Sequence, residues 1–105
     1  MTEGYGSGDF AFEVVHTGDV HVVSLHGQLD LANADRVRGA LIAVAGSTVV
    51  VDLSGLQFLD SSGVAALLGA RSQILDSGNG FELRGAQGIV RRVLDVTGLS
   101  HLLVE

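Results

Sequence analysis

Cysteine and lysine are both absent from this chain of 105 residues. Without cysteine, neither a disulfide nor a zinc site built on thiolates can form. The six cationic residues are all arginines and face twelve Asp and Glu, so the formal net charge is −6 at pH 7. Binding to nucleic acid or to an anionic membrane requires a basic patch, which a chain this acidic does not offer. The charge balance favours a protein partner instead.

Aromatic residues are scarce, with four Phe, one Tyr and no Trp, so stacking platforms for bases or sugars are not expected. No apolar run approaches the roughly 20 residues that span a bilayer. Residues 1–8 carry neither the basic nor the apolar part of a signal peptide. Their Gly and Ser content predicts a flexible lead-in over residues 1–9, followed by a single domain over residues 10–105. The lack of a signal peptide, of a membrane-spanning run and of cysteine fits a cytoplasmic protein.

The hydrophobic pattern predicts five strands, separated by turn signals. They are expected over residues 10–15, 20–26, 48–53, 81–83 and 101–104. The first two form a hairpin whose second strand ends at Gly27. The third is a β-branched run typical of a central strand covered on both faces, and Ser54-Gly55 is the turn signal after it.

Apolar residues at helical spacing predict three helices between these strands. The three stripes are Val37, Ala40, Leu41 and Val44; Val64, Leu67, Leu68, Arg71 and Leu75; and Val90, Val93, Leu94 and Thr97. Asn33 and Asp60 are the expected N-caps of the first two helices, and Gly46, Gly78 and Gly98 end the three. The order ββαβαβαβ predicts an α/β domain with a mainly parallel sheet of about five strands and helical crossovers. The initial hairpin adds an antiparallel strand at one side.

The run Asp60-Ser61-Ser62-Gly63 is the most informative motif, because it joins a predicted central strand to a predicted helix. With Asp60 as N-cap, Leu59 and Val64 take the two positions of a hydrophobic staple. Ser61 then occupies the first helical position, where its hydroxyl is not needed for capping and can face solvent. A helix N-terminus stabilises negative charge, so this hydroxyl is a good place to add or remove a phosphate. A plain helix cap, contributing ~1 kcal/mol, is the commoner explanation of so short a motif.

Asp30 and the small residues after Ser62 each have two interpretations. Asp30 is either an ordinary turn residue or a functional carboxylate at the end of a central strand, flanking Ser61 together with Asp60. The small residues are Gly63, Ala65, Ala66, Gly69 and Ala70. They either let the backbone of a partner approach or pack the helix closely on its own sheet, as is open for Gly63 and Ala66. The residues alone leave both questions open.

Other chemistries are disfavoured. His16, His21 and His26 share one hairpin, but five-residue steps alternate between the faces of a strand, so the three cannot converge on a metal. A serine hydrolase is disfavoured because Leu59 stands where the first Gly of G-x-S-x-G would be. Glycine-rich phosphate loops are absent. We therefore expect no metal, no cofactor and no enzyme activity.

Three segments, in the same order, carry a resemblance to a known family. Residues 49–64 resemble the signature of the STAS domain in bacterial anti-sigma factor antagonists. Upstream, residues 25–30 match that family's L-x-G-x-L-D element. Downstream, residues 90–94 with Thr97-Gly98-Leu99 match its final helix and TGL ending. The resemblance covers residues 10–104, nearly the whole chain.

The resemblance implies a regulator of transcription that binds an anti-sigma factor, usually a serine kinase of the GHKL type, and so releases a sigma factor. It implies that the kinase phosphorylates Ser61, that the phosphorylated form releases the kinase, and that a PP2C-type phosphatase reverses the step. The partner-binding surface is then expected to comprise Asp30, Asp60, Ser61, Ser62, Gly63 and Ala65. Ala65 departs from the family pattern, which often has Gly there. The alternative is a STAS scaffold subunit of a transporter or sensory complex, without a phosphate cycle.

Overall fold

A computed structural model describes residues 2–44 and 46–104 of the chain. Its elements, in chain order, are β1 (Thr2–Ser7), β2 (Phe10–Thr17), β3 (Val20–Leu29), α1 (Ala34–Ala43), β4 (Thr48–Leu59), α2 (Ser61–Asp76), β5 (Phe81–Arg84), α3 (Gly88–Val96) and the short 3₁₀ helix η1 (Ser100–Leu102). The predicted α/β class is confirmed. No helix within the described ranges is both long and apolar enough to cross a bilayer.

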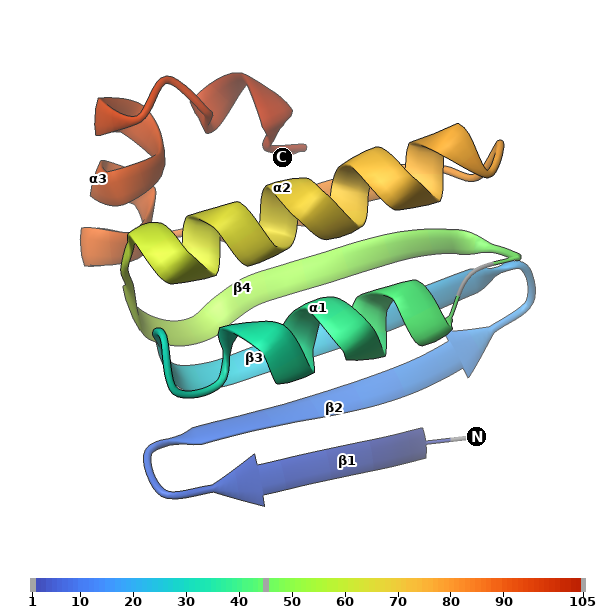
Figure 1. The fold of residues 1–105 in the computed structure, drawn as a ribbon, viewed down its shortest axis with the longest axis horizontal. Coiled ribbons are helices and arrows are strands. Elements are labelled where there is room, and N and C mark those ends of the chain that lie inside the picture. The colour runs from blue at the N-terminus through green and yellow to red at the C-terminus, as the bar shows by residue number, and fades with distance from the viewer. Residues whose placement is uncertain (1, 45, 105) are drawn as a thin grey trace.

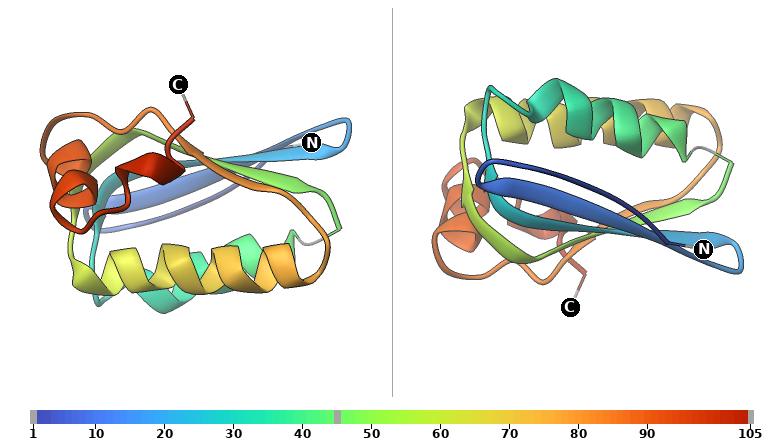
Figure 2. Two further views of the ribbon diagram at one scale, coloured as in Figure 1. Left: turned by 90° about the horizontal axis from the view of Figure 1, so that it is seen from above. Right: turned by 90° about the horizontal axis from the view of Figure 1, so that it is seen from below.

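The strands form one sheet in the order β1-β2-β3-β4-β5 (Figure 1). The two pairs on the N-terminal side are antiparallel, and β3–β4 and β4–β5 are parallel. Figures 1 and 2 show α1 and α2 lying side by side on one face of this sheet. The parallel pairs therefore arise from crossovers through α1 and α2, as the alternation of strands and helices predicts.

The N-terminal segment was predicted wrongly as a flexible lead-in. Residues Thr2–Ser7 form β1, which pairs with β2 from Thr2↔Val15 to Ser7↔Phe10. Without β1, the outer edge of β2 would be a row of unpaired N–H and C=O groups. A tight turn at Gly8-Asp9 joins the two strands and lets β1 pair with this edge. Glycine and serine there serve an edge strand rather than a loose linker. Met1 lies outside the described residues.

Two glycines taken as strand ends lie inside strands instead. β3 continues through Gly27, and β4 continues through Ser54 and Gly55. The pairing of β3 with β4 shifts register twice, between Ser24 and His26 and between Gly27 and Gln28, so β4 bulges rather than turns. A side chain at position 55 would collide with the His26 ring, which explains a glycine at this bulge.

The core packs α1, α2 and α3 against the sheet. Its largest fully buried side chains are Val23, Leu25, Leu29, Val37, Leu41, Val49, Val51, Leu53, Leu59, Ile74, Val90 and Leu94. The predicted stripe of α2 is right at Val64 and Leu67 but wrong at its end, because Leu75 is 40% exposed whereas Ile74 is buried. The buried positions of α2 are 63, 64, 66, 67, 70 and 74, and Leu75 lies outside this buried stripe.

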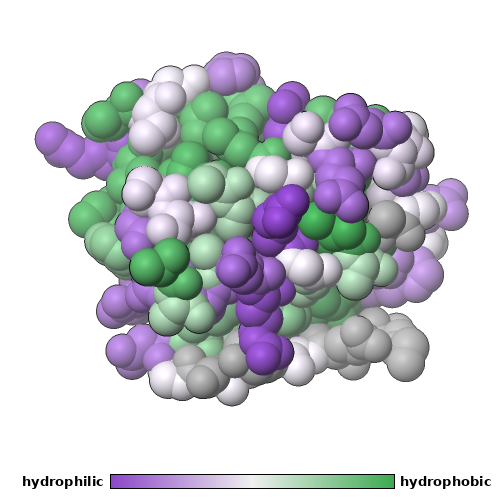
Figure 3. Space-filling model, viewed as in Figure 1, coloured by the Kyte–Doolittle hydropathy of each residue, from purple (hydrophilic) through white to green (hydrophobic). Residues whose placement is uncertain are grey.

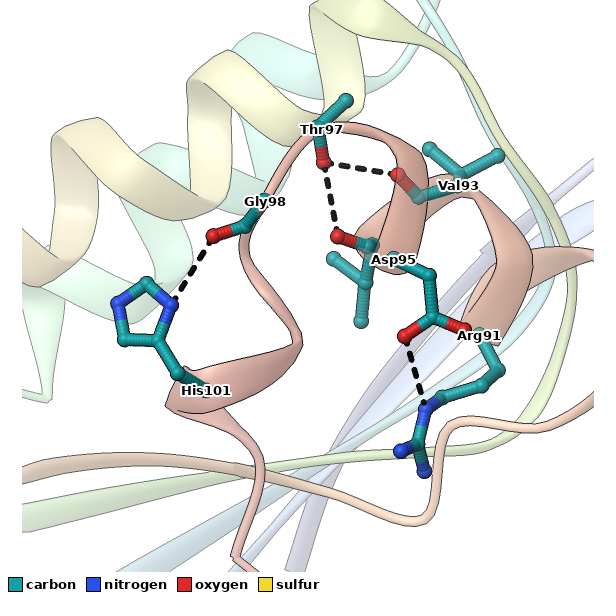
Figure 4. Close-up of polar contacts among 7 residues, drawn as sticks. Arg91, Val93, Asp95, Thr97, Gly98 and His101 are labelled. Atoms are coloured by element: carbon teal, nitrogen blue, oxygen red, sulfur yellow. Dashed lines mark hydrogen bonds and ion pairs between the residues drawn. The ribbon is translucent and has the colours of Figure 1, made fainter.

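Both predicted glycine stops after α2 and α3 are confirmed. Gly78 N–H donates to the Leu75 carbonyl at 2.9 Å, and Leu99 N–H donates to the Leu94 carbonyl at 2.8 Å, the bond pattern of Schellman caps. Figure 4 shows the turn after α3, where the Thr97 hydroxyl donates to the Val93 carbonyl at 2.8 Å. This turn fixes the direction in which the chain leaves α3.

The predicted last strand over residues 101–104 is wrong. After the α3 cap the chain forms η1, held in part by a bond between His101 Nδ1 and the Gly98 carbonyl at 3.0 Å (Figure 4). Within the described residues, a single bridge, Leu83↔Leu103, then joins it to β5, with Val104 N–H donating to the Leu83 carbonyl at 2.8 Å. Residues 100–102, which were predicted to begin a strand, form a turn of 3₁₀ helix instead.

Candidate functional site

The sheet register brings Asp30 and Asp60 to the same edge. Leu29, the last residue of β3, pairs with Leu59, the last residue of β4. The backbone N–H of Asp60 donates to the Leu29 carbonyl at 3.2 Å, which ties the two strand ends together. The interpretation of Asp30 as a residue at a strand end, next to Asp60, is therefore correct in position. Sites in open α/β sheets gather at such carboxyl ends.

Asp60 caps α2 as predicted. Its backbone is extended, and its Oδ1 accepts a hydrogen bond from Gly63 N–H at 3.0 Å. Leu59 and Val64 are both buried, as a hydrophobic staple requires. Because one carboxylate satisfies the cap, neither of the following serines is needed for it.

Ser61 is the exposed residue at the first position of α2. Its hydroxyl has no hydrogen-bond partner in the described parts of the chain, and neither has that of the half-buried Ser62. The residue predicted to face solvent is therefore exposed. An exposed, unbonded hydroxyl at a helix N-terminus can accept a phosphoryl group without breaking an internal contact.

The loop between β3 and α1 is held by Asp30 and Asn33. Ala32 N–H donates to Asp30 Oδ1 at 3.0 Å, and the Asp30 backbone N–H donates to Asn33 Oδ1 at 3.0 Å. Asn33 Nδ2 donates to the Gln28 carbonyl at 2.9 Å. Asn33 stands at the predicted N-cap position of α1, but its side chain makes no capping bond because these loop contacts occupy it. The loop therefore presents the Asp30 carboxylate in a fixed position.

Gly63 is buried and lets the first turn of α2 pack closely against the ends of β3 and β4. A Cβ at this position would lie 2.6 Å from Leu59 Cδ1 and 3.0 Å from the Leu29 carbonyl oxygen. Only glycine lets the first turn of α2 approach both strand ends so closely. Of the two interpretations of the small residues, close packing on the parent sheet holds for Gly63. Ala65, one turn further along α2 than Ser61, is exposed.

A groove between α1 and α2 extends from this edge, and the sequence analysis missed it. It encloses about 430 Å³ and is lined by Leu31, Ala34, Asp35, Arg38, Ser62, Ala65, Ala66 and Gly69. Leu31 directly follows Asp30 and is 79% exposed. A leucine immediately after a candidate site carboxylate, in a loop that needs no apolar residue, was the signal in the sequence.

Asp52 has a lowered pKa but belongs to the sheet rather than to this edge. Burial is the largest influence and opposes its ionisation, yet the Ser54 N–H and hydroxyl, Arg84 and His26 outweigh burial and hold the pKa below its usual value. The Ser54 N–H lies 3.0 Å from Asp52 Oδ1, and the Arg84 guanidinium lies 3.8 Å from Oδ2. These contacts stabilise the bulged part of β4 and its pairing with β5.

The histidines of the hairpin do not form a metal site. The rings of His16 and His21 stack with centroids 4.0 Å apart and planes 2° from parallel, so their nitrogen lone pairs do not converge. His21 instead bonds the Ser47 hydroxyl through Nδ1, and His26 lies at the bulge over Gly55. No group of three or more potential metal ligands occurs in residues 2–44 and 46–104.

Comparison with known proteins agrees with this architecture. A family model described as "Mlab, STAS domain" matches residues 12–105. The anti-sigma F factor antagonist of Paenibacillus polymyxa is 33% identical over 95 residues, covering 87% of this chain and 81% of that protein.

Two solved structures share the fold. The anti-sigma factor antagonist SpoIIAA in its unphosphorylated form superposes with a TM-score of 0.78 at 24% identity, covering 89% of this chain and 85% of that one. The Bacillus cell fate determinant SpoIIAA in its phosphorylated form gives a TM-score of 0.70 at 24% identity, covering 89% and 88%. With the family match across nearly all of the chain, these likenesses show that the protein belongs to the STAS-domain family of anti-sigma factor antagonists.

Proposed function

We propose that this protein binds an anti-sigma factor of the GHKL serine-kinase type through the surface around Ser61, and thereby releases a sigma factor. Phosphorylation of Ser61 by that kinase ends the binding, and a PP2C-type phosphatase restores it. The observation that carries the proposal is the exposed Ser61, whose hydroxyl makes no hydrogen bond to any of the residues that the structure describes. The similar Paenibacillus polymyxa protein is an anti-sigma F factor antagonist, and the similarly folded SpoIIAA has a phosphorylated form; both facts favour the proposal.

A phosphate at Ser61 is compatible with the fold of this protein but disturbs the surface that contacts the partner. A phosphate adds about −1.5 to −2 charges at pH 7. The N-terminus of α2 stabilises negative charge, so the fold is expected to survive. Towards a partner, the same phosphate stands beside Asp60 and near Asp30, and it adds volume where a neutral hydroxyl was. Converting a contact of about 2–3 kcal/mol into repulsion lowers affinity by roughly two orders of magnitude.

Burial separates the two candidate serines. Ser61 is exposed, whereas Ser62 is half-buried and faces the groove between the helices. A kinase active site must surround its acceptor hydroxyl, which favours Ser61. In this role the protein is the substrate of a kinase and the ligand of an anti-sigma factor, not an enzyme, and it acts in the bacterial cytoplasm without nucleic acid or cofactor.

The test combines binding with phosphosite mapping. The purified protein is titrated against a panel of anti-sigma kinases, including the anti-sigma F factor of Paenibacillus polymyxa, and then incubated with each and ATP. We expect binding to at least one, phosphate on Ser61 by mass spectrometry, and no labelling of S61A while S62A is still labelled. Phosphate confined to Ser62 would overturn the site assignment. Failure to bind any anti-sigma factor, with capture of transporter or sensory subunits instead, would favour the scaffold function.

A further inference from the structure

We propose that the groove between α1 and α2 extends the partner surface beyond Ser61, with Leu31 as its apolar anchor and Arg38 as the counter-charge to a carboxylate of the bound anti-sigma factor. This inference rests on the proposed function and adds the chemistry of the partner segment. That segment carries both an exposed apolar side chain and an acidic one.

The groove is continuous with the predicted site. Ser62 and Ala65 line it from α2, and both lie within one turn of Ser61. Leu31 lines it from the loop that also fixes Asp30. Figure 3 looks onto this face and shows green apolar and pale surface crossed by a band of purple hydrophilic atoms. A partner segment that contacts Ser61 is therefore next to the groove.

Leu31 has the features of an anchor residue. It is 79% exposed, although a leucine normally gains 1.5–3 kcal/mol from full burial, a range typical of apolar side chains. The loop that carries it is fixed by the Asp30 and Asn33 hydrogen bonds, so little backbone freedom remains to be lost on binding. Rigid, exposed apolar side chains next to a polar rim are typical of interface cores.

Arg38 supplies the charge. Its side chain lies across Gly69, where an added Cβ would meet Nε at 3.0 Å. It makes no hydrogen bond or ion pair with any other residue that the structure describes. Arg92 on α3 has no ion pair within the described parts of the chain either, so what distinguishes Arg38 is its position in the groove. A planar guanidinium pairs with a carboxylate through two parallel hydrogen bonds, which sets both position and orientation of the partner.

The experiment uses the full chain and two matched controls. L31S is compared with V96S, because Val96 on α3 is also 79% exposed, and R38E is compared with R92E, because Arg92 is an exposed arginine on α3. Affinity for the anti-sigma factor that binds the wild-type protein is measured by calorimetry. Thermal melts show that each variant is folded. Hydrogen exchange of the wild-type complex adds a readout that depends on no substitution.

We expect L31S and R38E each to weaken binding by about tenfold or more, as truncation of interface anchors does, while V96S and R92E stay within about twofold. R38E should also reduce the salt dependence of binding. The complex should protect the amides of residues 34–43. If L31S and R38E match their controls while S61D still prevents binding, the groove is not part of the interface and the proposed function stands. If the wild-type protein binds no anti-sigma factor, both proposals fail.

Discussion

Replacing Gly63 with alanine tests how tightly the site is built on the sheet. The new Cβ would lie 2.6 Å from Leu59 Cδ1, 2.9 Å from Leu29 Cγ and 3.0 Å from the Leu29 carbonyl oxygen. Ordinary contacts begin at 3.4 Å, so the three overlaps are 0.8, 0.5 and 0.4 Å. Leu59 is 1% exposed and Leu29 is fully buried, so neither side chain has room to withdraw. The first turn of α2 has to move instead.

The expected loss follows from these overlaps. Inserting a methyl group into a filled core costs about 1–3 kcal/mol, and the higher helix propensity of alanine returns up to about 1 kcal/mol. A net loss of about 1–2 kcal/mol lowers the melting temperature by roughly 4–15 °C in a domain of this size. Since Asp60 N–H bonds the same Leu29 carbonyl, G63A should also shift Ser61 and weaken partner binding.

The matched control is Gly39, in the middle of α1 and with nothing within 4 Å of an added Cβ. G39A should raise the melting temperature by a few degrees, because alanine stabilises a helix by about 0.5–1 kcal/mol relative to glycine. Differential scanning calorimetry of both variants makes the comparison. A G63A protein that melts at or above the wild-type temperature would refute the packing of α2 described above.

Two further substitutions probe charge. S61D should leave the melting temperature unchanged or slightly raised, because a carboxylate in the first turn of a helix contributes about 0.3–1 kcal/mol; a drop of more than about 5 °C would mean that Ser61 is chiefly structural. D52N should be less stable than wild type near neutral pH, where Asp52 is ionised and bonded to Ser54 and Arg84. Since its folded pKa lies below its unfolded value, this advantage is present above about pH 4 and is lost as the pH falls through the folded pKa. Urea unfolding of D52N and wild type at pH 7 and at about pH 2 measures the difference in their free energies of unfolding at each pH. A difference that does not shrink in acid contradicts the role assigned to Asp52.

The sequence predicted most of the elements that local chemistry decides. The cap at Asp60, the staple at Leu59 and Val64, and the glycine stops at Gly78 and Gly98 depend on residues close in the chain. Each was therefore readable from spacing alone. The same locality explains why the exposure of Ser61 could be predicted.

What was missed depends on contacts between distant segments. β1 exists because the edge of β2 accepts it, and no residue of the glycine-rich N-terminus signals that pairing. Gly55 resembles a turn residue until His26 of the neighbouring strand is placed against it. The groove with Leu31 and Arg38 appears only once α1 and α2 lie side by side. Tertiary packing decides these features, and for the groove the sequence carries one local signal, the leucine directly after Asp30.

The central claim is that one exposed hydroxyl switches partner binding. Its most direct test is a pair of titrations of the same anti-sigma factor, one with unphosphorylated protein and one with protein carrying phosphate on Ser61 alone. We predict a dissociation constant about 100-fold larger for the phosphorylated form, corresponding to about 2.7 kcal/mol, with the fold intact by circular dichroism. Equal affinity of the two forms would contradict the account.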